Sequence, residues 1–181
     1  MPFSFDHIIE VKKYLTKLRV DYWYSNSFMS IEWFCLLAIL IISWLIALKL
    51  LNKKKSTAVI LFGLLMILIF DFLDQLGVMF NLWDYRIEIA PLPTGLLAIN
   101  YAFAPVSSML IYQYFPDWKR FLLYSILLSL AGSAIIEPLL AVYKIYIIIN
   151  WEHYYSFPIY IAITAIDKII VDYLDQLRLK A

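Results

Sequence analysis

Seven polar side chains lie within stretches of sequence that are otherwise strongly apolar. Asp71, Asp74 and Gln75 are spaced i, i+3 and i+4, which places all three on one face of a helix. A carboxylate near the centre of a bilayer costs about 2.5 to 3.5 kcal/mol on insertion scales, so such residues usually face a bundle interior or a wet cavity. A cluster of this kind is able to bind a cation, a proton or a polar headgroup. Its candidate members are Asp71, Asp74, Gln75, Asn100, Glu137, Asp167 and Lys168.

Two interpretations of this acidic cluster remain open. In the first, Lys168 pairs with one carboxylate, and the other acids are protonated or hydrogen-bonded to Asn100 and Gln75, so that the cluster only fixes helix packing. In the second, the acids outnumber the single lysine because the cluster forms a binding pocket that opens outward. We favour the second interpretation, since an unpaired carboxylate in a membrane is costly to retain without a use.

The residues that common catalytic and metal sites need are largely missing. His7 and His153 form no paired zinc-binding pattern, and Cys35 is the single cysteine. No serine-nucleophile motif is present, and four scattered glycines form no phosphate-binding loop. The D-x-x-D spacing of Asp71 and Asp74 is similar to the magnesium-binding aspartates of intramembrane prenyl and phospho-alcohol transferases, but the further aspartates on a second helix are missing. We therefore predict no metal and no cofactor, assign no catalytic residue, and leave enzymatic activity open but less favoured.

Composition and hydropathy define the elements that must position the polar residues. Of the 181 residues, 64% are hydrophobic and 16% are charged, whereas soluble domains are about half apolar and about a quarter charged. The apolar runs reach the ~20 residues that a helix needs to cross the hydrocarbon core. We predict an all-α fold, a polytopic transmembrane bundle of about five helices, at residues 31–51, 57–80, 91–115, 118–145 and 156–177.

The first thirty residues are predicted to form a separate amphipathic segment. Ile8, Val11, Leu15 and Leu18 recur at helical spacing, and the basic residues fall mostly on the other side. Such a helix lies along a membrane surface or packs on a partner protein, and we favour the surface. The predicted organisation is an N-terminal segment, 1–30, followed by one transmembrane bundle, 31–181.

The charges of the short loops predict an orientation and exclude one class of partner. By the positive-inside rule the basic side is cytoplasmic, so we predict a multi-pass protein of the cell membrane with its N-terminus outside and its C-terminus inside. The net charge of +1 provides no basic surface for nucleic acid. The predicted partners are the lipid bilayer and, because five helices are few for a transporter, a second copy or another membrane protein. The residues of the basic side are Lys49, Lys53, Lys54, Lys55, Lys119, Arg120, Arg178 and Lys180.

The order of landmarks along the chain indicates a duplicated helical hairpin. In each unit a helix with an acidic residue is followed by a tryptophan and then by a helix with a polar residue. Trp83 precedes Asn100 by 17 positions, and Trp151 precedes Asp167 and Lys168 by 16 and 17. Parallel repeats of this kind, related by an axis along the membrane normal, occur in transporters.

Aromatic and proline residues after the first predicted helix carry a resemblance to a known family. They include Leu92-Pro93, Tyr101, Pro105, Tyr114-Phe115-Pro116, Trp118 and Trp151-Glu152-His153-Tyr154-Tyr155-Ser156-Phe157-Pro158, with Glu137 between them. With these residues the chain resembles small, uncharacterised membrane proteins of about five helices from spore-forming Gram-positive bacteria. The resemblance implies a bacterial plasma-membrane or spore-membrane protein and no particular activity. The hairpins are also similar to the small-subunit type of lycopene cyclase, in which Leu-Pro is followed by paired glutamates, whereas Thr94-Gly95 follow here.

Three functions from different classes therefore remain. The first is a small membrane binding or transport component with an acidic intramembrane pocket. The second is a lipid- or isoprenoid-modifying enzyme that uses Glu137 or Asp71 as a general acid. The third is a structural or scaffolding membrane protein that docks a partner through its N-terminal helix. A central cavity containing the acids supports the first or the second, whereas tightly paired acids support the third.

Overall fold

The computed structural model describes residues 4–52, 56–92 and 95–180, and most of them are helical. The predicted all-α class is confirmed. Lys53, Lys54 and Lys55 of the predicted basic side, and Pro93 and Thr94, lie outside the described residues. The helices are α1 (Phe5–Tyr22), α2 (Ile31–Leu50), α3 (Ser56–Met79), α4 (Ala104–Tyr114), α5 (Trp118–Ala131), α6 (Glu137–Val142) and α7 (His153–Lys180), with π-helical turns η1 (Trp23–Ser27), η2 (Ile99–Phe103) and η3 (Gly132–Ile136).

Within the described residues, three helical segments are long and apolar enough to cross a membrane. They are Ile31–Leu50, Thr57–Met79 and Trp118–Val142. Large apolar side chains such as Leu45, Leu64 and Leu127 are more than half exposed, whereas polar side chains point inward. An exposed apolar surface of this extent needs a covering, and helices of this length and hydropathy are consistent with a covering of lipid.

Two prolines explain why two of the long helices contain a π-helical turn. Pro105 follows η2 and Pro138 follows η3. A proline inside a helix has no N–H for the carbonyl four residues earlier and its ring crowds that carbonyl, so the helix widens locally. The carbonyl that Pro105 leaves free, that of Tyr101, accepts a hydrogen bond of 3.0 Å from Trp44 Nε1 on α2.

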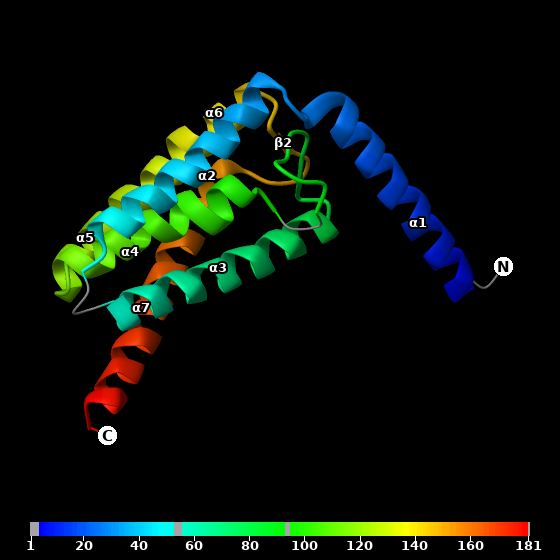
Figure 1. Cartoon of the computed structure of the whole chain (residues 1–181). Coiled ribbons are helices and arrows are strands. Elements are labelled where there is room, and N and C mark those ends of the chain that lie inside the picture. The colour runs from blue at the N-terminus through cyan, green and yellow to red at the C-terminus, as the bar shows by residue number, and fades with distance from the viewer. Residues whose placement is uncertain (1–3, 53–55, 93–94, 181) are drawn as a thin grey trace.

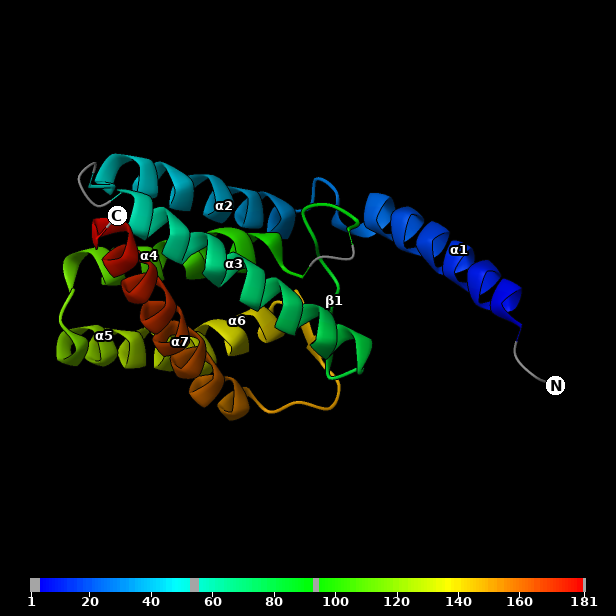
Figure 2. The same ribbon diagram turned by 90° about the horizontal axis from the view of Figure 1, so that it is seen from below.

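Two short strands join the loops at one end of the bundle. β1 (Trp83–Tyr85) follows α3, and β2 (Tyr146–Ile148) follows α6. The strands pair antiparallel, with Trp83 opposite Ile148 and Tyr85 opposite Tyr146, so the pairing has a local two-fold axis between Asp84 and Ile147. Figures 1 and 2 show the strands beside the C-terminal end of α3, with the C-terminus of the chain at the opposite end of the bundle.

The boundaries of three predicted helices differ from those in the structure. The third helix begins at residue 97 rather than 91, the fourth ends at Val142 rather than 145, and the last extends from His153 to Lys180. The prolines at 91 and 93 disfavour helical conformation before them. The backbone of residues 86–89 is instead held by side chains, because the indole Nε1 atoms of Trp23 and Trp33 donate to the carbonyls of Glu88 and Ile89, both at 2.9 Å.

The helix α1 extends away from the bundle on the strand side, across the direction of α2 (Figure 1). None of its residues is buried, and the apolar positions Ile8, Val11, Leu15 and Leu18 are about half exposed. Its attachment to the bundle is polar: Arg19 lies 3.6 Å from Asp84. The amphipathic helix is thus present, and its apolar stripe is not buried by the described chain.

Candidate functional site

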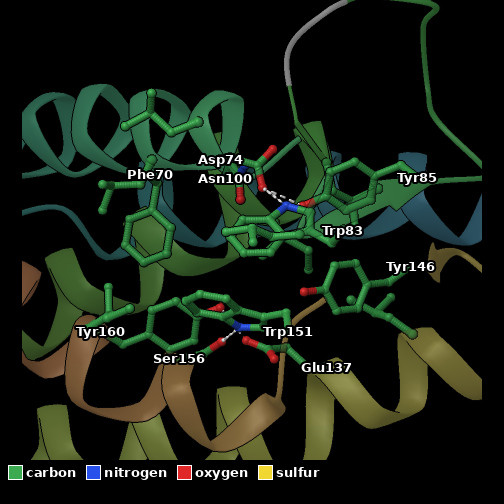
Figure 3. A pocket seen from close by; sticks show the side chains of 18 of the residues that line it. Phe70, Asp74, Trp83, Tyr85, Asn100, Glu137, Tyr146, Trp151, Ser156 and Tyr160 are labelled. Atoms are coloured by element: carbon green, nitrogen blue, oxygen red, sulfur yellow. Dashed lines mark hydrogen bonds between the residues drawn. The ribbon is translucent and has the colours of Figure 1, made fainter. Parts of the chain in front are cut away.

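A cavity of about 280 Å³ lies at the strand end of the bundle, between α3, α6 and α7. Most of its lining is apolar or aromatic, and Figure 3 shows two carboxyl groups reaching it from opposite sides, Asp74 from α3 and Glu137 from α6. No lysine, arginine or histidine belongs to the lining among the described residues. The aromatic residues of the lining are Phe70, Phe80, Trp83, Tyr85, Tyr146, Trp151 and Tyr160.

Asp74 is held in place by two residues of β1. Its Oδ1 accepts hydrogen bonds from Tyr85 Oη at 2.5 Å and from Trp83 Nε1 at 3.0 Å. The Trp83 ring reaches this position because it lies over Gly77, where an added Cβ would be 2.0 Å from the ring. The hydrogen bond from Trp83 to Asp74 therefore depends on Gly77, because a side chain at that position of α3 would block the Trp83 ring.

The second oxygen of Asp74 faces the backbone of Gly95. A Cβ added to Gly95 would lie 1.5 Å from Asp74 Oδ2 and 2.5 Å from Asn100 Nδ2. These two atoms are buried and make no hydrogen bond of standard geometry to the described residues, although they lie beside one another. Asn100 therefore joins the site from η2, and Gly95 is required there because no other residue leaves room for the carboxylate.

Glu137 is held by two residues of α7 in a closely similar way. Its Oε1 accepts a hydrogen bond from Tyr160 Oη at 2.5 Å, and its Oε2 lies 3.0 Å from His153 Nδ1. The side chain of Glu137 is only 10% exposed. Each acid of the cavity therefore has one tyrosine hydroxyl at 2.5 Å and one ring nitrogen at 3.0 Å.

The strand pairing relates the two acids to each other. Asp74 precedes Trp83, the first residue of β1, by nine positions, and Glu137 precedes Tyr146, the first residue of β2, also by nine. The chain turns into each strand through a left-handed residue two positions before it, Asn81 with φ 53° and Lys144 with φ 54°. By this register Trp83 corresponds to Tyr146 and Asp74 to Glu137, whereas the repeat predicted from the sequence matched Trp83 with Trp151.

The structure brings together three of the seven predicted site residues, Asp74, Asn100 and Glu137. Asp71 and Gln75 lie outside the cavity and pair with each other, with Gln75 Nε2 donating to Asp71 Oδ2 at 2.6 Å. Asp71 does not line the cavity, whereas its neighbour Phe70, also one turn before Asp74 on α3, does.

The last two predicted residues lie nearer the opposite end. Lys168 Nζ is 3.0 Å from Asp172 Oδ2, as expected of neighbours at i, i+4, and lies over the rings of Tyr112, Trp118 and Phe121. It neutralises neither acid of the cavity. Asp167 is fully buried and touches no hydrogen-bond partner among the described residues.

Sequence reasoning missed the groups that hold the acids. Trp83, Tyr85, His153 and Tyr160 are polar aromatic residues, which a membrane sequence places at interfaces for other reasons as well. Burial raises the pKa of Tyr85, and the adjacent Asp74 carboxylate raises it further, so the hydroxyl remains a donor. The one usable signal was the equal spacing of nine residues, which becomes visible only when the strands are known.

The site provides no recognisable centre for a metal ion. Among the residues that the structure describes, no group of three or more His, Cys, Asp or Glu side chains converges. The chain matches no protein-family model, no curated protein and no solved structure.

Proposed function

We propose that the protein is a membrane component that binds a ligand. The cavity at the strand end, called the outer cavity from here on, takes a small hydrophobic molecule with a positive charge. The observation that carries this proposal is the pairing of two carboxyl groups with an aromatic lining that includes no basic side chain among the described residues. This is a cavity of the type expected for the first or second function, rather than the closed acid pairs of a scaffold.

The physical chemistry of the lining favours a cationic over a neutral ligand. Ring faces attract a cation electrostatically, by about 2 kcal/mol or more when the cation is desolvated. The carboxyl groups add charge attraction in a medium of low dielectric constant. A small alkylammonium ion is attracted both by the ring faces and by the carboxyl groups. Its apolar body fills the apolar remainder of the cavity.

The arrangement in the membrane is part of the same proposal. We propose five crossings, formed by α2, α3, η2 with α4, α5 to α6, and α7, with the strands and the N-terminus outside a cell membrane. Lys49, Lys119, Arg120 and Arg178 occupy the end away from the strands, which supports this orientation. The equal spacing of Asp74 and Glu137 before their strands supports a duplicated hairpin, and the family resemblance supports a bacterial origin. The apolar stripe and the basic residues of α1 support a position of this helix on the outer surface of the cell membrane.

The test is a binding measurement with a matched pair of probes. Benzyltrimethylammonium and neopentylbenzene have the same shape, but only the first is charged. By calorimetry on the purified protein in detergent, we expect the ammonium ion to bind and the neutral compound to bind at least about tenfold more weakly, a difference of about 1.4 kcal/mol.

Substitutions assign the binding to the cavity. Asp74→Asn and Glu137→Gln should each weaken binding of the ammonium ion by about tenfold or more, while Asp175→Asn should not, because Asp175 pairs with Arg178 away from the cavity. Thermal unfolding of each variant shows whether it is folded. Equal binding of both probes would refute a cation site, and unchanged binding by both folded cavity variants would refute its location.

A further inference from the structure

Asp167 is a carboxyl group that the outer cavity does not use. It stands near the middle of α7, with 14 helix residues before it and 13 after it. The side chain is 0% exposed, and neither oxygen has a hydrogen-bond partner in the described part of the chain. Lys168, its neighbour in sequence, is turned away toward Asp172 and three aromatic rings.

Such a group is stable only as a neutral acid. Burying an ionised carboxylate without a partner is far more costly than burying a protonated one, and the penalty is largest in the middle of a membrane bundle. Within the described part of the chain Asp167 forms no ion pair. The charged groups that the structure places on or against α7 include Glu137, beside His153 and Tyr160, and the pair Lys168–Asp172.

A small second cavity extends from Glu137 to Thr164, one helical turn before Asp167 on α7. It has a volume of about 70 Å³ and is lined by the hydroxyl-bearing residues Ser108, Ser129, Tyr160 and Thr164 as well as by Glu137. This volume is sufficient for water, which needs about 10 to 15 Å³ and two to four polar partners. Glu137 and Tyr160 also line the outer cavity, so they form the boundary between the two spaces.

Asp167 does not line this second cavity, but it stands one helical turn beyond Thr164, which does. Thr164 and Asp167 are spaced i, i+3, which places them on one face of α7 within a helical turn. Beyond Asp167 that face continues with Val171, which packs in an apolar cluster with Phe62 and Phe121, and all three are fully buried. Asp167 is therefore approached by polar groups from the strand end and closed off by apolar packing at the other end.

We propose that Asp167 is an intramembrane proton-binding site, which exchanges its proton with the strand side through the small cavity and Glu137. The ligand is a proton rather than a metal ion, because no group of three or more His, Cys, Asp or Glu side chains converges on Asp167 within the described residues to replace a hydration shell. This site is separate from the cation pocket, and it stands whether or not that pocket binds an ammonium ion.

Infrared spectroscopy of the purified protein tests the proton site. A protonated carboxyl group has a C=O band distinct from that of a carboxylate, and the band shifts in deuterium oxide. At neutral pH and in a Glu88→Gln background, which removes a carboxyl group that burial keeps partly protonated there, we expect such a band in the otherwise unchanged protein and with Asp175→Asn, but not with Asp167→Asn. If Asp167→Asn fails to fold, the protein without this substitution is prepared with aspartate that is isotopically labelled at its side-chain carboxyl carbon. The band then shifts in frequency if it comes from a protonated aspartate. A spectrum with no protonated aspartate would overturn the proposal.

The rate at which deuterium replaces the proton of Asp167 tests the proposed route through the small cavity and Glu137. Ser108→Val adds bulk to the small cavity and removes a hydroxyl group, whereas Ser107→Val changes a neighbour on α4 that does not line it. We expect exchange at Asp167 to be at least about tenfold slower in Ser108→Val and in Glu137→Gln than in Ser107→Val. Equal rates in folded variants would overturn the path through Glu137, and a band suppressed by sodium at fixed pH would overturn the assignment of the proton as ligand.

Discussion

At the scale of single residues, the site depends on hydrogen bonds from aromatic side chains that hold two acids, and no lysine or arginine of the described residues pairs with either acid. Asp74 and Glu137 each accept from a tyrosine hydroxyl at 2.5 Å. Hydrogen bonds to a charged acceptor contribute about 1.5 to 3 kcal/mol, and they leave the net charge of the carboxylate in place. Held in this way, the acids keep their charge available to a ligand, which a salt bridge to lysine would not allow.

Gly95 offers a residue-level prediction with a matched control. In Gly95→Ala the new methyl group would lie 1.5 Å from Asp74 Oδ2, so we expect the unfolding free energy to fall by about 1 to 3 kcal/mol and ammonium binding to be lost. In Gly132→Ala the nearest atom is a Tyr160 ring carbon at 3.4 Å, an ordinary contact. Chemical denaturation and calorimetry of both variants check this, and equal behaviour of the two would contradict the close approach.

At the scale of elements, the segment between β1 and η2 connects the bundle to α1. Ser27 Oγ donates to the Arg86 carbonyl at 3.1 Å, and Arg86 Nε donates to Tyr22 Oη, also at 3.1 Å. With the indole bonds to Glu88 and Ile89, side chains satisfy three backbone carbonyls of this segment, while the backbone N–H of Arg86 donates to the Ile145 carbonyl. The same segment carries Gly95 at its end, so the docking of α1 and the shape of the cavity share one piece of chain.

Glu88 gives this segment a predictable pH dependence. Burial raises the pKa of Glu88 from 4.5 to about 7. The folded state then holds more protons than the unfolded state between these values, so the contribution of Glu88 to stability falls as pH rises through this interval. We expect Glu88→Gln to raise the melting temperature relative to wild type above the interval, and this difference to disappear below it.

Thermal unfolding of the detergent-solubilised protein on both sides of the interval measures the effect. Glu152→Gln, in the exposed loop after β2, is the matched control for losing one carboxyl group. A Glu88→Gln difference from wild type that stays constant across the interval would show that the burial of Glu88 is not what governs stability there.

At the scale of the whole molecule, polarity is arranged in reverse of a soluble protein. Buried polar residues such as Ser125, Ser129 and Thr164 lie in the interior, while leucine and isoleucine cover the outside. In the membrane arrangement proposed above, lipid removes the usual penalty for this distribution, and a low-dielectric exterior makes interior polar contacts the determinants of packing.

Cysteine labelling tests the arrangement across the membrane. In a Cys35→Ser background we expect Glu152→Cys to react with a membrane-impermeant maleimide on intact cells, and Lys119→Cys to react only after permeabilisation. The segment from Trp118 to Val142 separates the two positions. Reaction of both from the same side would show that this segment does not cross the bilayer.

Much of the fold could be predicted because long apolar runs have few structural solutions. A backbone in lipid must satisfy its own hydrogen bonds, so a run such as Ile31–Leu50 is helical whatever surrounds it. The membrane segments and the presence of inward carboxyl groups followed from this rule. The prolines at 105 and 138 pointed to local irregularity, but they did not reveal that a π-helical turn places Glu137 at the cavity.

Only the tertiary structure decided which of the inward acids share a site. Asp71 and Asp74 are close in sequence, yet one turn of α3 separates an acid that pairs with Gln75 from an acid that lines the cavity. The pairing of β1 with β2 depends on contacts across more than sixty positions, and no local pattern encodes it. The sequence by itself determined that the chain buries acids among apolar helices, because hydropathy is additive along the chain. Their division into a paired acid, two cavity acids and one isolated acid arose from packing, because distances between helices are set by the whole fold.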